Sequence, residues 1–319
     1  MPPVRAAVVE DGSIVVADRP DPEPGAGEVL VRVRAAGLNG ADLLQRAGRY
    51  PAPPGSPPDI PGLELAGEVV ARGPGAERFV EGDRVMAVVG GGGQAELCVV
   101  HERGAMPVPE RLEWTEAGAA AEVFTTAHDA LFTQAGLASG DRLLVHGGAG
   151  GVGTAGVQLG VATGARVTAT VRDEGLRGEV SRLGATVIAP EGFEEQGPFD
   201  VVLELLGAPN LSGDLSALAT GGRIVIIGVG AGAKAELNLL ALMGKRARIF
   251  GSTLRARPLE EKAAAMRLVE RHVLPLLEDG TVRVLLEESF PLERAAEAYE
   301  RFAGGGKLGK VALTMGTWR

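Results

Sequence analysis

Short apolar runs separated by turn residues fill the first third of the chain. Short runs of this kind, bounded by turn residues, are typical of strands. Proline and glycine punctuate the runs at 20–27, 51–61 and 90–93, and a short helix is predicted over 39–47. Many short strands with such turns predict a β-rich, barrel-like domain. The predicted strands are 4–10, 14–18, 28–36, 66–72, 84–89 and 94–100.

The middle of the chain alternates between strand-like and helix-like segments. This alternation predicts a parallel sheet covered by helices on both faces. Six strands match the number in a complete doubly wound, dinucleotide-binding sheet. The predicted strands are 142–146, 166–171, 186–189, 200–205, 222–228 and 247–251. The predicted helices between them are 152–163, 174–183, 210–218 and 237–245.

The last segment returns to a mixed pattern. It predicts a long helix over 259–278, a strand over 284–288, a helix over 292–303 and a strand over 310–314. We expect this segment to pack back on the first domain.

Composition narrows the class of protein. With 319 residues and 45% hydrophobic content, the chain is long enough for two domains with sizeable cores. The net charge of −9 argues against nucleic acid and anionic membrane as partners, because both require basic patches. No signal peptide and no membrane-spanning apolar run is recognised, so we expect a cytoplasmic protein.

A glycine-rich segment follows the first strand of the middle region. Gly148, Gly150 and Gly153 form a G-x-G-x-x-G pattern between an apolar strand and a helix, which is the context that a dinucleotide-binding turn requires. The glycines permit a tight turn, close approach to a diphosphate and close packing of helix on strand. A purely structural glycine turn is the alternative. A P-loop is excluded because no Gly-Lys-Ser/Thr follows.

The end of the next strand bears on the choice of cofactor. Sites for NAD usually carry Asp or Glu there, on the ribose 2′-hydroxyl. Here Val171 takes that position and Arg172 follows. An arginine binds the 2′-phosphate of NADP well, and Arg177 is a second candidate. Asp173 is adjacent and weakens the signal, and Arg172 as a solvated strand end is the alternative; we favour NADPH.

Several motifs together resemble a known family. The segments 36–42 (AGLNGAD), 45–50 (QRAGRY), 61–67 (PGLELAG), 123–127 (VFTTA) and 146–153 (HGGAGGVG) resemble the quinone oxidoreductases of the medium-chain dehydrogenase/reductase superfamily, near zeta-crystallin. Segments 251–254 and 309–311 resemble late cofactor-contacting segments of that family, and the similarity spans nearly the whole chain.

The resemblance implies an α/β architecture of two domains. A GroES-like, β-rich catalytic domain would comprise 1–114 and 286–319, and a Rossmann domain with a doubly wound, six-stranded parallel sheet would comprise 115–285. It also implies a cleft between the domains and a homodimer formed through the Rossmann sheet edge, with 247–254 as the dimer strand.

The glycine motif, the arginines and the resemblance together define the expected NADPH-contacting residues. These are Thr126, Gly148, Ala149, Gly150, Gly151, Val152, Gly153, Thr170, Arg172, Arg177, Leu206, Gly207, Ile227, Gly228, Ser252, Leu254 and Lys310.

No zinc site is expected. Zinc-using relatives carry Cys where this chain has Asn39 and His where it has Leu63, and they carry a four-cysteine lobe. The single cysteine, Cys98, allows no disulfide and no thiolate cluster. Without a Lewis acid a plain carbonyl is hard to polarise, so the acceptor should be activated by conjugation, as in a quinone or an α,β-unsaturated carbonyl.

Three residues are the candidates for catalysis. Asn39 can donate an amide hydrogen bond to an oxygen on which charge develops, and Tyr50 can donate a hydrogen bond or a proton to it. The alternatives are a helix cap for Asn39 and loop packing for Tyr50. Asp42 is expected to orient the loop through an i,i+4 pair with Arg46.

Two departures from the family pattern affect these assignments. Leu44 stands where other members carry a second tyrosine, and Leu176 stands where many NADP-using relatives carry lysine. The first weakens the transfer of a substrate role, and the second weakens the transfer of a phosphate role.

Three functions therefore stay open at this point. The leading hypothesis is an NADPH:quinone oxidoreductase with a small-molecule substrate. The second is an enoyl or alkenal reductase that reduces a carbon–carbon double bond. The third is an NADPH-binding, zeta-crystallin-like protein with low turnover.

Overall fold

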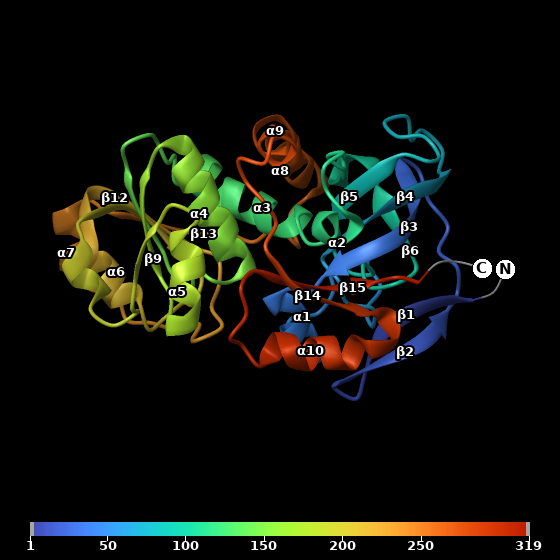
Figure 1. Cartoon of the computed structure of the whole chain (residues 1–319), viewed down its shortest axis with the longest axis horizontal. Helices are drawn as coiled ribbons and strands as arrows, with labels where there is room; N and C mark the ends of the chain where they lie inside the picture. The colour runs from blue at the N-terminus through green and yellow to red at the C-terminus, as the bar shows by residue number, and fades with distance from the viewer. Residues whose placement is uncertain (1–2, 317–319) are drawn as a thin grey trace. The chain divides into compact units, whose positions relative to one another are not determined.

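The computed structural model describes residues 3–316 and divides into two compact units. Of the described residues, the first unit contains 3–123, 254–305 and 310–316, and the second contains 124–253 and 306–309. Each unit is an α/β assembly with its own sheet (Figure 1).

The first unit is rich in β-strands, as the short apolar runs and their turns predict, and most of its strand pairs are antiparallel. Strands β1 (Val4–Glu10) and β2 (Ser13–Arg19) form a two-stranded sheet. A seven-stranded sheet runs in the order β14-β15-β3-β4-β5-β7, with β6 also paired to β3. Its strands are β3 (Glu28–Gly37), β4 (Glu64–Arg72), β5 (Arg84–Val88), β6 (Leu97–His101), β7 (Ala105–Pro107), β14 (Leu286–Pro291) and β15 (Lys310–Thr314).

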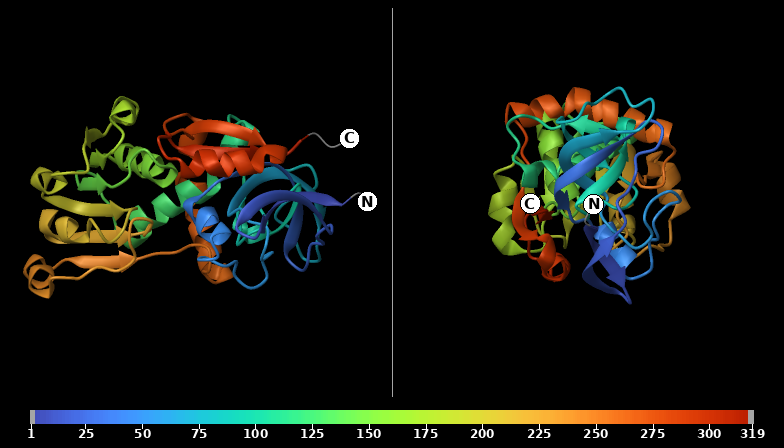
Figure 2. Two further views of the ribbon diagram at one scale, coloured as in Figure 1. Left: turned by 90° about the horizontal axis from the view of Figure 1, so that it is seen from below. Right: turned by 90° about the vertical axis from the view of Figure 1, so that its right-hand side faces the viewer.

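The end of the chain completes this unit. Strand β15 pairs with β14 in parallel and with β3 in antiparallel orientation, and α10 (Ala295–Ala303) packs against β2, β14 and β15. These late elements, red in Figure 2, lie side by side. Tyr299 and Phe290 bury their rings in the same apolar cluster as Val31 and Leu65, so the expectation that the last segment packs back on the first domain is confirmed.

The second unit is a six-stranded sheet in which all neighbouring strands are parallel. Its order is β10-β9-β8-β11-β12-β13, which is the doubly wound arrangement predicted from the strand–helix alternation. The strands are β8 (Arg142–Val145), β9 (Arg166–Thr170), β10 (Thr186–Ile188), β11 (Phe199–Glu204), β12 (Leu218–Ile226) and β13 (Arg248–Gly251).

Four helices connect these strands. They are α4 (Gly151–Thr163), α5 (Glu174–Ser181), α6 (Leu211–Ala217) and α7 (Leu239–Lys245). Because crossovers between parallel strands are right-handed, the two directions of winding place their helices on opposite faces. Figure 1 shows α4 and α5 on one side of the sheet and α6 and α7 on the other. Because the strands are parallel, the carboxyl ends of β8, β9, β11 and β12 lie at the same edge of the sheet.

Several predicted elements need correction. The helix predicted over 259–278 is two helices, α8 (Leu259–His272) and α9 (Leu274–Glu278), because Pro275 has no N–H to continue the first. Residues 114–134, left without helices in the prediction, form α2 (Trp114–Ala117), α3 (Ala121–His128) and a π-helical segment (Asp129–Gln134). The predicted helix 292–303 begins with a 3₁₀ turn, Leu292–Arg294.

The predicted domain limits differ from the division into units at 254–285. That segment was placed in the Rossmann domain, but its helix α8 packs on β7 and on the 3₁₀ turn Glu102–Gly104 of the first unit. Arg267 donates to Ala105 O at 2.6 Å, and Arg78 pairs with Glu270 at 2.7 Å. These contacts hold α8 to the β-rich unit.

Candidate functional site

Asn39 stands immediately before helix α1 (Gly40–Arg46) in the first unit and is only 8% exposed. Its backbone N–H donates to Asp42 Oδ2 at 2.8 Å, so the third residue of the helix caps its start. Asp42 Oδ1 also accepts from Gly62 N at 3.1 Å. Asp42 therefore ties the Asn39 turn to the loop that precedes β4.

The side chain of Asn39 belongs to a buried polar triangle. Its Nδ2 donates to Glu64 Oε1 at 3.0 Å, and its Oδ1 accepts from Lys310 Nζ at 2.6 Å. Lys310 Nζ lies 2.7 Å from Glu64 Oε1 and also donates to Leu38 O at 2.5 Å. A primary amide has two N–H donors, and the triangle uses one of the two Nδ2 hydrogens of Asn39.

Glu64 completes the triangle from β4. Its other oxygen, Oε2, accepts from Glu122 N at 2.8 Å. Both Glu64 and Lys310 are almost fully buried, and a buried ion pair is tolerated only when its remaining hydrogen-bonding groups are satisfied. The contacts to Asn39, Leu38 and Glu122 meet that condition.

Tyr50 is held by an arginine that the sequence analysis did not single out. The guanidinium of Arg255 lies 4.9 Å from the centre of the Tyr50 ring and donates to Tyr50 O at 3.0 Å. It also donates to Gly90 O at 2.7 Å and to Gln45 Oε1 at 2.6 Å. Arg255 is buried, and burial lowers its pKa. It joins the Tyr50 loop to α1 and to the glycine loop at 90.

The expected pair between Asp42 and Arg46 is not formed. Arg46 Nη1 donates to Glu300 Oε1 at 2.7 Å, and its guanidinium lies over the Tyr299 ring. Asp42 faces inward instead, because the backbone N–H groups of Asn39 and Gly62 offer it buried donors. Burial raises the pKa of Asp42 to about 6, opposed by those two backbone hydrogen bonds. Asp42 therefore holds the turn at Asn39 and the loop at Gly62 together.

In the second unit the glycine motif forms the predicted turn between β8 and α4. Gly147 has a φ of +65°, and Gly148 N donates to Thr170 O at 3.0 Å. A Cβ on Gly153 would lie 2.2 Å from Gly147 O and 2.9 Å from Gly148 Cα. The helix therefore starts directly against the turn, which no side chain at Gly153 would allow.

This turn suits a diphosphate. The first main-chain hydrogen bond of α4 is donated by Thr154 N to Gly150 O at 2.8 Å, so the amide groups of 151–153 point off the helix end. A helix N-terminus with such amides and its positive dipole end binds anions. Gly309 N reaches Ala149 O at 2.7 Å, so the segment 306–309 closes one side of the turn.

The two arginine candidates lie after β9, whose last residue, Thr170, is buried. Arg172 is exposed, and Arg177 Nε donates to Val171 O at 3.1 Å. Both therefore belong to the segment where a ribose 2′-substituent is expected. Asp173 caps α5 through Gly175 N at 3.0 Å, so its carboxylate has a structural role.

Further predicted cofactor residues follow the ends of other strands. The amides of Leu206 and Gly207 donate to the Glu204 carboxylate after β11, and those of Ile227 and Gly228 donate to Glu204 O. Ser252 Oγ donates to Asp129 Oδ2 at 3.2 Å.

The remaining predicted cofactor residues are Thr126, Leu254 and Lys310. Thr126 is buried in α3, and Leu254 is buried at the start of the segment that returns to the first unit. Lys310 lies in the triangle with Asn39 and Glu64, which its assignment to the cofactor did not anticipate.

The sequence carried a weak signal for one of the residues that were missed. Glu64 is an acid inside the apolar run Leu63-Glu64-Leu65-Ala66, and a charge within a buried strand normally has a partner. Arg255 and Gln45 gave no comparable signal, because 210 positions separate the two residues that meet.

Two family models match the chain. The model described as an alcohol dehydrogenase GroES-like domain matches residues 25–110, and the model described as a zinc-binding dehydrogenase matches residues 183–313. They fall respectively on the β-rich unit and on a region that begins in the parallel sheet and runs into the last strand.

Relatives align over nearly the whole length. The quinone oxidoreductase of Rattus norvegicus is 32% identical over 307 residues, which cover 92% of this chain and 91% of the relative. The quinone oxidoreductase of Homo sapiens is 32% identical over 310 residues, with the same coverage of both chains.

Solved structures of alcohol dehydrogenases and their relatives are also similar to this chain over nearly its whole length. An alcohol dehydrogenase superfamily protein from Novosphingobium aromaticivorans has a TM-score of 0.85 at 31% identity, covering 98% of this chain and 99% of that chain. An NAD-dependent alcohol dehydrogenase has a TM-score of 0.86 at 30% identity, covering 98% and 100%. A cobalt- and zinc-bound alcohol dehydrogenase from Pyrobaculum aerophilum has a TM-score of 0.83 at 28% identity, covering 98% and 99%.

The triangle predicts the result of a stability experiment. Lys310→Met leaves the Glu64 carboxylate buried without its cation, and removing one partner of such a pair costs about 3–5 kcal/mol. Lys310→Met should lower the free energy of unfolding by that amount in urea denaturation, and adding Glu64→Gln should recover part of it. Lys234→Met, at an exposed lysine, is the control; a single Lys310→Met variant as stable as this control would contradict the interpretation.

Proposed function

Since the chain belongs to the quinone oxidoreductase family of the medium-chain dehydrogenase/reductase superfamily, and is thus an oxidoreductase with a nicotinamide cofactor, we propose that it reduces quinones with NADPH and without a metal. The observation that carries the proposal is the buried Asn39–Glu64–Lys310 triangle. In it the Lys310 ammonium contacts Asn39, which stands where relatives with zinc carry Cys, and Glu64, which follows the position of their His.

The second unit supplies the binding site in this proposal. The amides of 151–153 and the close turn at Gly153 would bind the diphosphate of the dinucleotide. Thr170, Leu206, Gly207, Ile227 and Gly228, at the carboxyl ends of the strands, would line the rest of the cofactor path. Ala149, Ser252, Thr126 and Leu254 are proposed contacts by the same resemblance.

Preference for NADPH rests on charge at the end of β9. A 2′-phosphate needs cationic donors, and Arg172 and Arg177 are the arginines of this segment, with Val171 where an acid would favour NAD. Arg172 is exposed, so its guanidinium is accessible to a phosphate.

The residues of the first unit would act on the acceptor. When bound, the nicotinamide would supply a hydride, which carries both electrons and one hydrogen, and reduction of a quinone to a hydroquinone then needs one proton in addition. The free Nδ2 hydrogen of Asn39 would stabilise the oxygen on which negative charge develops, and the Tyr50 hydroxyl would donate a proton to it. Arg255 would orient Tyr50, and Asp42 would hold the Asn39 turn.

The side chains around Asn39 support catalysis without a metal. Asn39 Oδ1 and Glu64 Oε1 both face the Lys310 ammonium at 2.6–2.7 Å, and a cation already held there disfavours a second one. Cys98 lies buried in β6, where burial raises the pKa of its thiol to about 12 and disfavours the thiolate that zinc requires.

We also propose that the protein forms a homodimer through β13. This strand is the last of the parallel sheet, and unpaired edge strands readily pair with a second chain. The helix before it, α7, exposes large apolar side chains, with Leu240 79% and Met243 69% exposed. A second copy seated on β13 would cover both features.

The location of the protein is proposed as cytoplasmic. Among residues 3–316, no helix is both long and apolar enough to cross a membrane. The acidic net charge of −9 agrees with the absence of an attraction to anionic lipids.

The choice of acceptor can be tested directly. NADPH oxidation should be followed spectrophotometrically with a panel of quinones, enoyl thioesters and alkenals; quinones should be turned over at least as fast as the alkenes. Tyr50→Phe should lower kcat by at least about a hundredfold, the low end for loss of general acid catalysis. Reduction of alkenes only would support the enoyl or alkenal reductase, tight NADPH binding without turnover would support the zeta-crystallin-like alternative, and stoichiometric zinc in the active protein would contradict metal-free chemistry.

The cofactor assignment has its own variant. Arg172→Glu should raise the Kd for NADPH about tenfold to hundredfold, since a hydrogen bond to a charged group contributes ~1.5–3 kcal/mol, and should leave the Kd for NADH nearly unchanged. Arg166→Glu, at the exposed opposite end of β9, is the matched control. Equal losses for the two dinucleotides would remove Arg172 from the phosphate site.

The dimer can be tested by light scattering after size-exclusion chromatography. Wild-type protein should elute with twice the mass of the chain, and Leu240→Glu combined with Met243→Glu should give monomers, because two charges would be buried in the apolar contact. Val80→Glu, at an exposed apolar residue of the first unit, should stay dimeric. A monomeric wild type would refute the proposal.

A further inference from the structure

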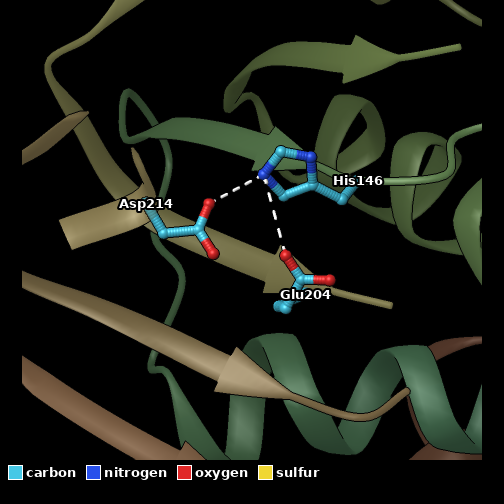
Figure 3. Close-up of side chains that lie close together, drawn as sticks. All are labelled: His146, Glu204 and Asp214. Carbon is cyan, nitrogen blue, oxygen red and sulfur yellow. Dashed lines mark hydrogen bonds and ion pairs between the residues drawn. The ribbon is translucent and has the colours of Figure 1, made fainter. Parts of the chain in front are cut away.

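Three buried ionisable side chains meet beneath the glycine turn of the second unit. His146 follows β8, Glu204 ends β11 and Asp214 lies in α6; all three are at most 1% exposed. His146 Nε2 lies 2.8 Å from Asp214 Oδ1 and 3.9 Å from Glu204 Oε2. Figure 3 shows both carboxylates directed at the same ring nitrogen.

Two members of this cluster, His146 and Glu204, also contact loops at the carboxyl edge of the sheet. His146 Nδ1 lies 3.1 Å from Thr170 Oγ1, which accepts from Gly147 N at 3.3 Å. Glu204 Oε1 accepts from Gly207 N at 2.7 Å and from Leu206 N, and its Oε2 accepts from Asn210 Nδ2 at 3.0 Å. The cluster thus connects the turn after β8, the end of β9 and the loop after β11.

The charges of the cluster are not balanced. Two carboxylates face one imidazole, so the hydrogen bond between His146 Nε2 and Asp214 Oδ1 is donated by the ring when Asp214 is ionised and by the carboxyl when Asp214 is protonated. Asp214 Oδ2 is buried with no hydrogen-bond partner among the described residues. A second buried negative charge without a donor is costly, which favours a proton held within the cluster.

The pKa of Asp214 agrees with this geometry. Burial, opposed by the His146 ring and reinforced by the Glu204 carboxylate, raises the pKa of Asp214 to about 6. Other charged groups that meet α6 are Glu194, near Gly213, and Lys245, whose ammonium binds Ser216 O and Leu218 O. The ordinary value is 3.8, so the folded protein retains this proton at a higher pH than the unfolded chain.

From these contacts we infer that His146, Glu204 and Asp214 form a proton-sharing clamp: positioning residues that hold the three dinucleotide-binding loops together and set the negative charge beneath the bound diphosphate. The inference rests on the proposed NADPH site and adds a set of residues that control its affinity. Protonation of the clamp removes a negative charge from under an anionic ligand, so NADPH affinity should rise as the pH falls through about 6.

A metal ion is the competing use of the same three side chains, whose ligand atoms lie within 4.8 Å of one another. The hydrogen bonds favour the proton. Glu204 already accepts three N–H groups, and His146 Nε2 is in direct hydrogen-bonding contact with Asp214. A metal bound to all three side chains would have to displace the hydrogen bond between His146 Nε2 and Asp214 Oδ1.

Asp214→Asn is the decisive variant because it reproduces the shape of the protonated side chain. Dissociation constants for NADPH should be measured by fluorescence titration from pH 5 to pH 8, together with melting temperatures and steady-state kinetics. At pH 8 the variant should bind NADPH several-fold more tightly than the wild type. At pH 5 the two proteins should agree, because the wild-type carboxyl is then protonated.

The melting temperatures test the clamp without any cofactor. A folded-state pKa above the unfolded value makes the Asp214 contribution to stability fall as the pH rises from about 4 to about 6. The wild type should show that fall, and Asp214→Asn should lack it. Asp200→Asn is the matched control: Asp200 pairs with Arg142 at the opposite strand ends, and the Arg142 hydrogen bond lowers the pKa of that carboxyl. It should change the stability profile in the opposite sense and leave the Kd for NADPH unchanged.

A second variant keeps the test decisive if Asp214→Asn does not fold. His146→Gln removes the ring between Asp214 and Thr170 and should raise the KM for NADPH at every pH, with kcat at saturating NADPH little changed. A wild type that binds no NADPH at any pH would refute the cofactor site itself. A wild type that binds NADPH, with variants that match its Kd and pH profile, would overturn the clamp alone. Stoichiometric metal in the wild type that is lost in Asp214→Asn would also overturn it.

Discussion

The buried ion pair between Lys310 and Glu64 is the contact on which the β-rich unit of this protein depends. One partner comes from β4 and the other from the final strand β15, 246 positions apart in sequence, and the amide of Asn39 bridges them. Because neither charge reaches water, every remaining hydrogen-bonding group has to be met by the chain. The backbone oxygen of Leu38 and the N–H of Glu122 meet that need. The same contacts that satisfy the pair also orient the Asn39 amide, which is the proposed hydrogen-bond donor to the acceptor.

A different constraint governs the parallel sheet. There the backbone itself comes so close to a helix that Gly153 has no room for a side chain, and the helix begins with its amides directed outward. The outward-directed N–H groups of such a turn are hydrogen-bond donors, which suits an anion. The ends of β9, β11 and β12 add their loops at the same edge. The buried cluster of His146, Glu204 and Asp214 connects the turn after β8, the end of β9 and the loop after β11. In the proposed site, protonation of this cluster would therefore affect binding of the dinucleotide.

The family contains members with different catalytic equipment on this framework. One similar structure is described as cobalt- and zinc-bound, whereas the relatives aligned over nine-tenths of the chain are quinone oxidoreductases. In this chain the positions around Asn39 carry an amide, a carboxylate and an ammonium. In the proposed reaction the Asn39 amide of that set would stabilise a developing oxyanion on a conjugated acceptor without a Lewis acid.

Much of this architecture could be predicted from local pattern. Short apolar runs with their turns and the strand–helix repeats predicted both sheets, and the glycine spacing in 147–153 predicted the close turn between β8 and α4, because these patterns act over a few residues. The long-range contacts could not be predicted in this way. Sequence placed Lys310 with the cofactor and paired Asp42 with Arg46, whereas folding placed Lys310 on Glu64 and turned Asp42 toward the amides of Asn39 and Gly62. Arg255 on Tyr50 and the meeting of His146, Glu204 and Asp214 likewise appeared only in the folded chain. Local order follows from neighbours along the chain, but the partner of a buried charge is decided by which strand ends the completed sheets bring together.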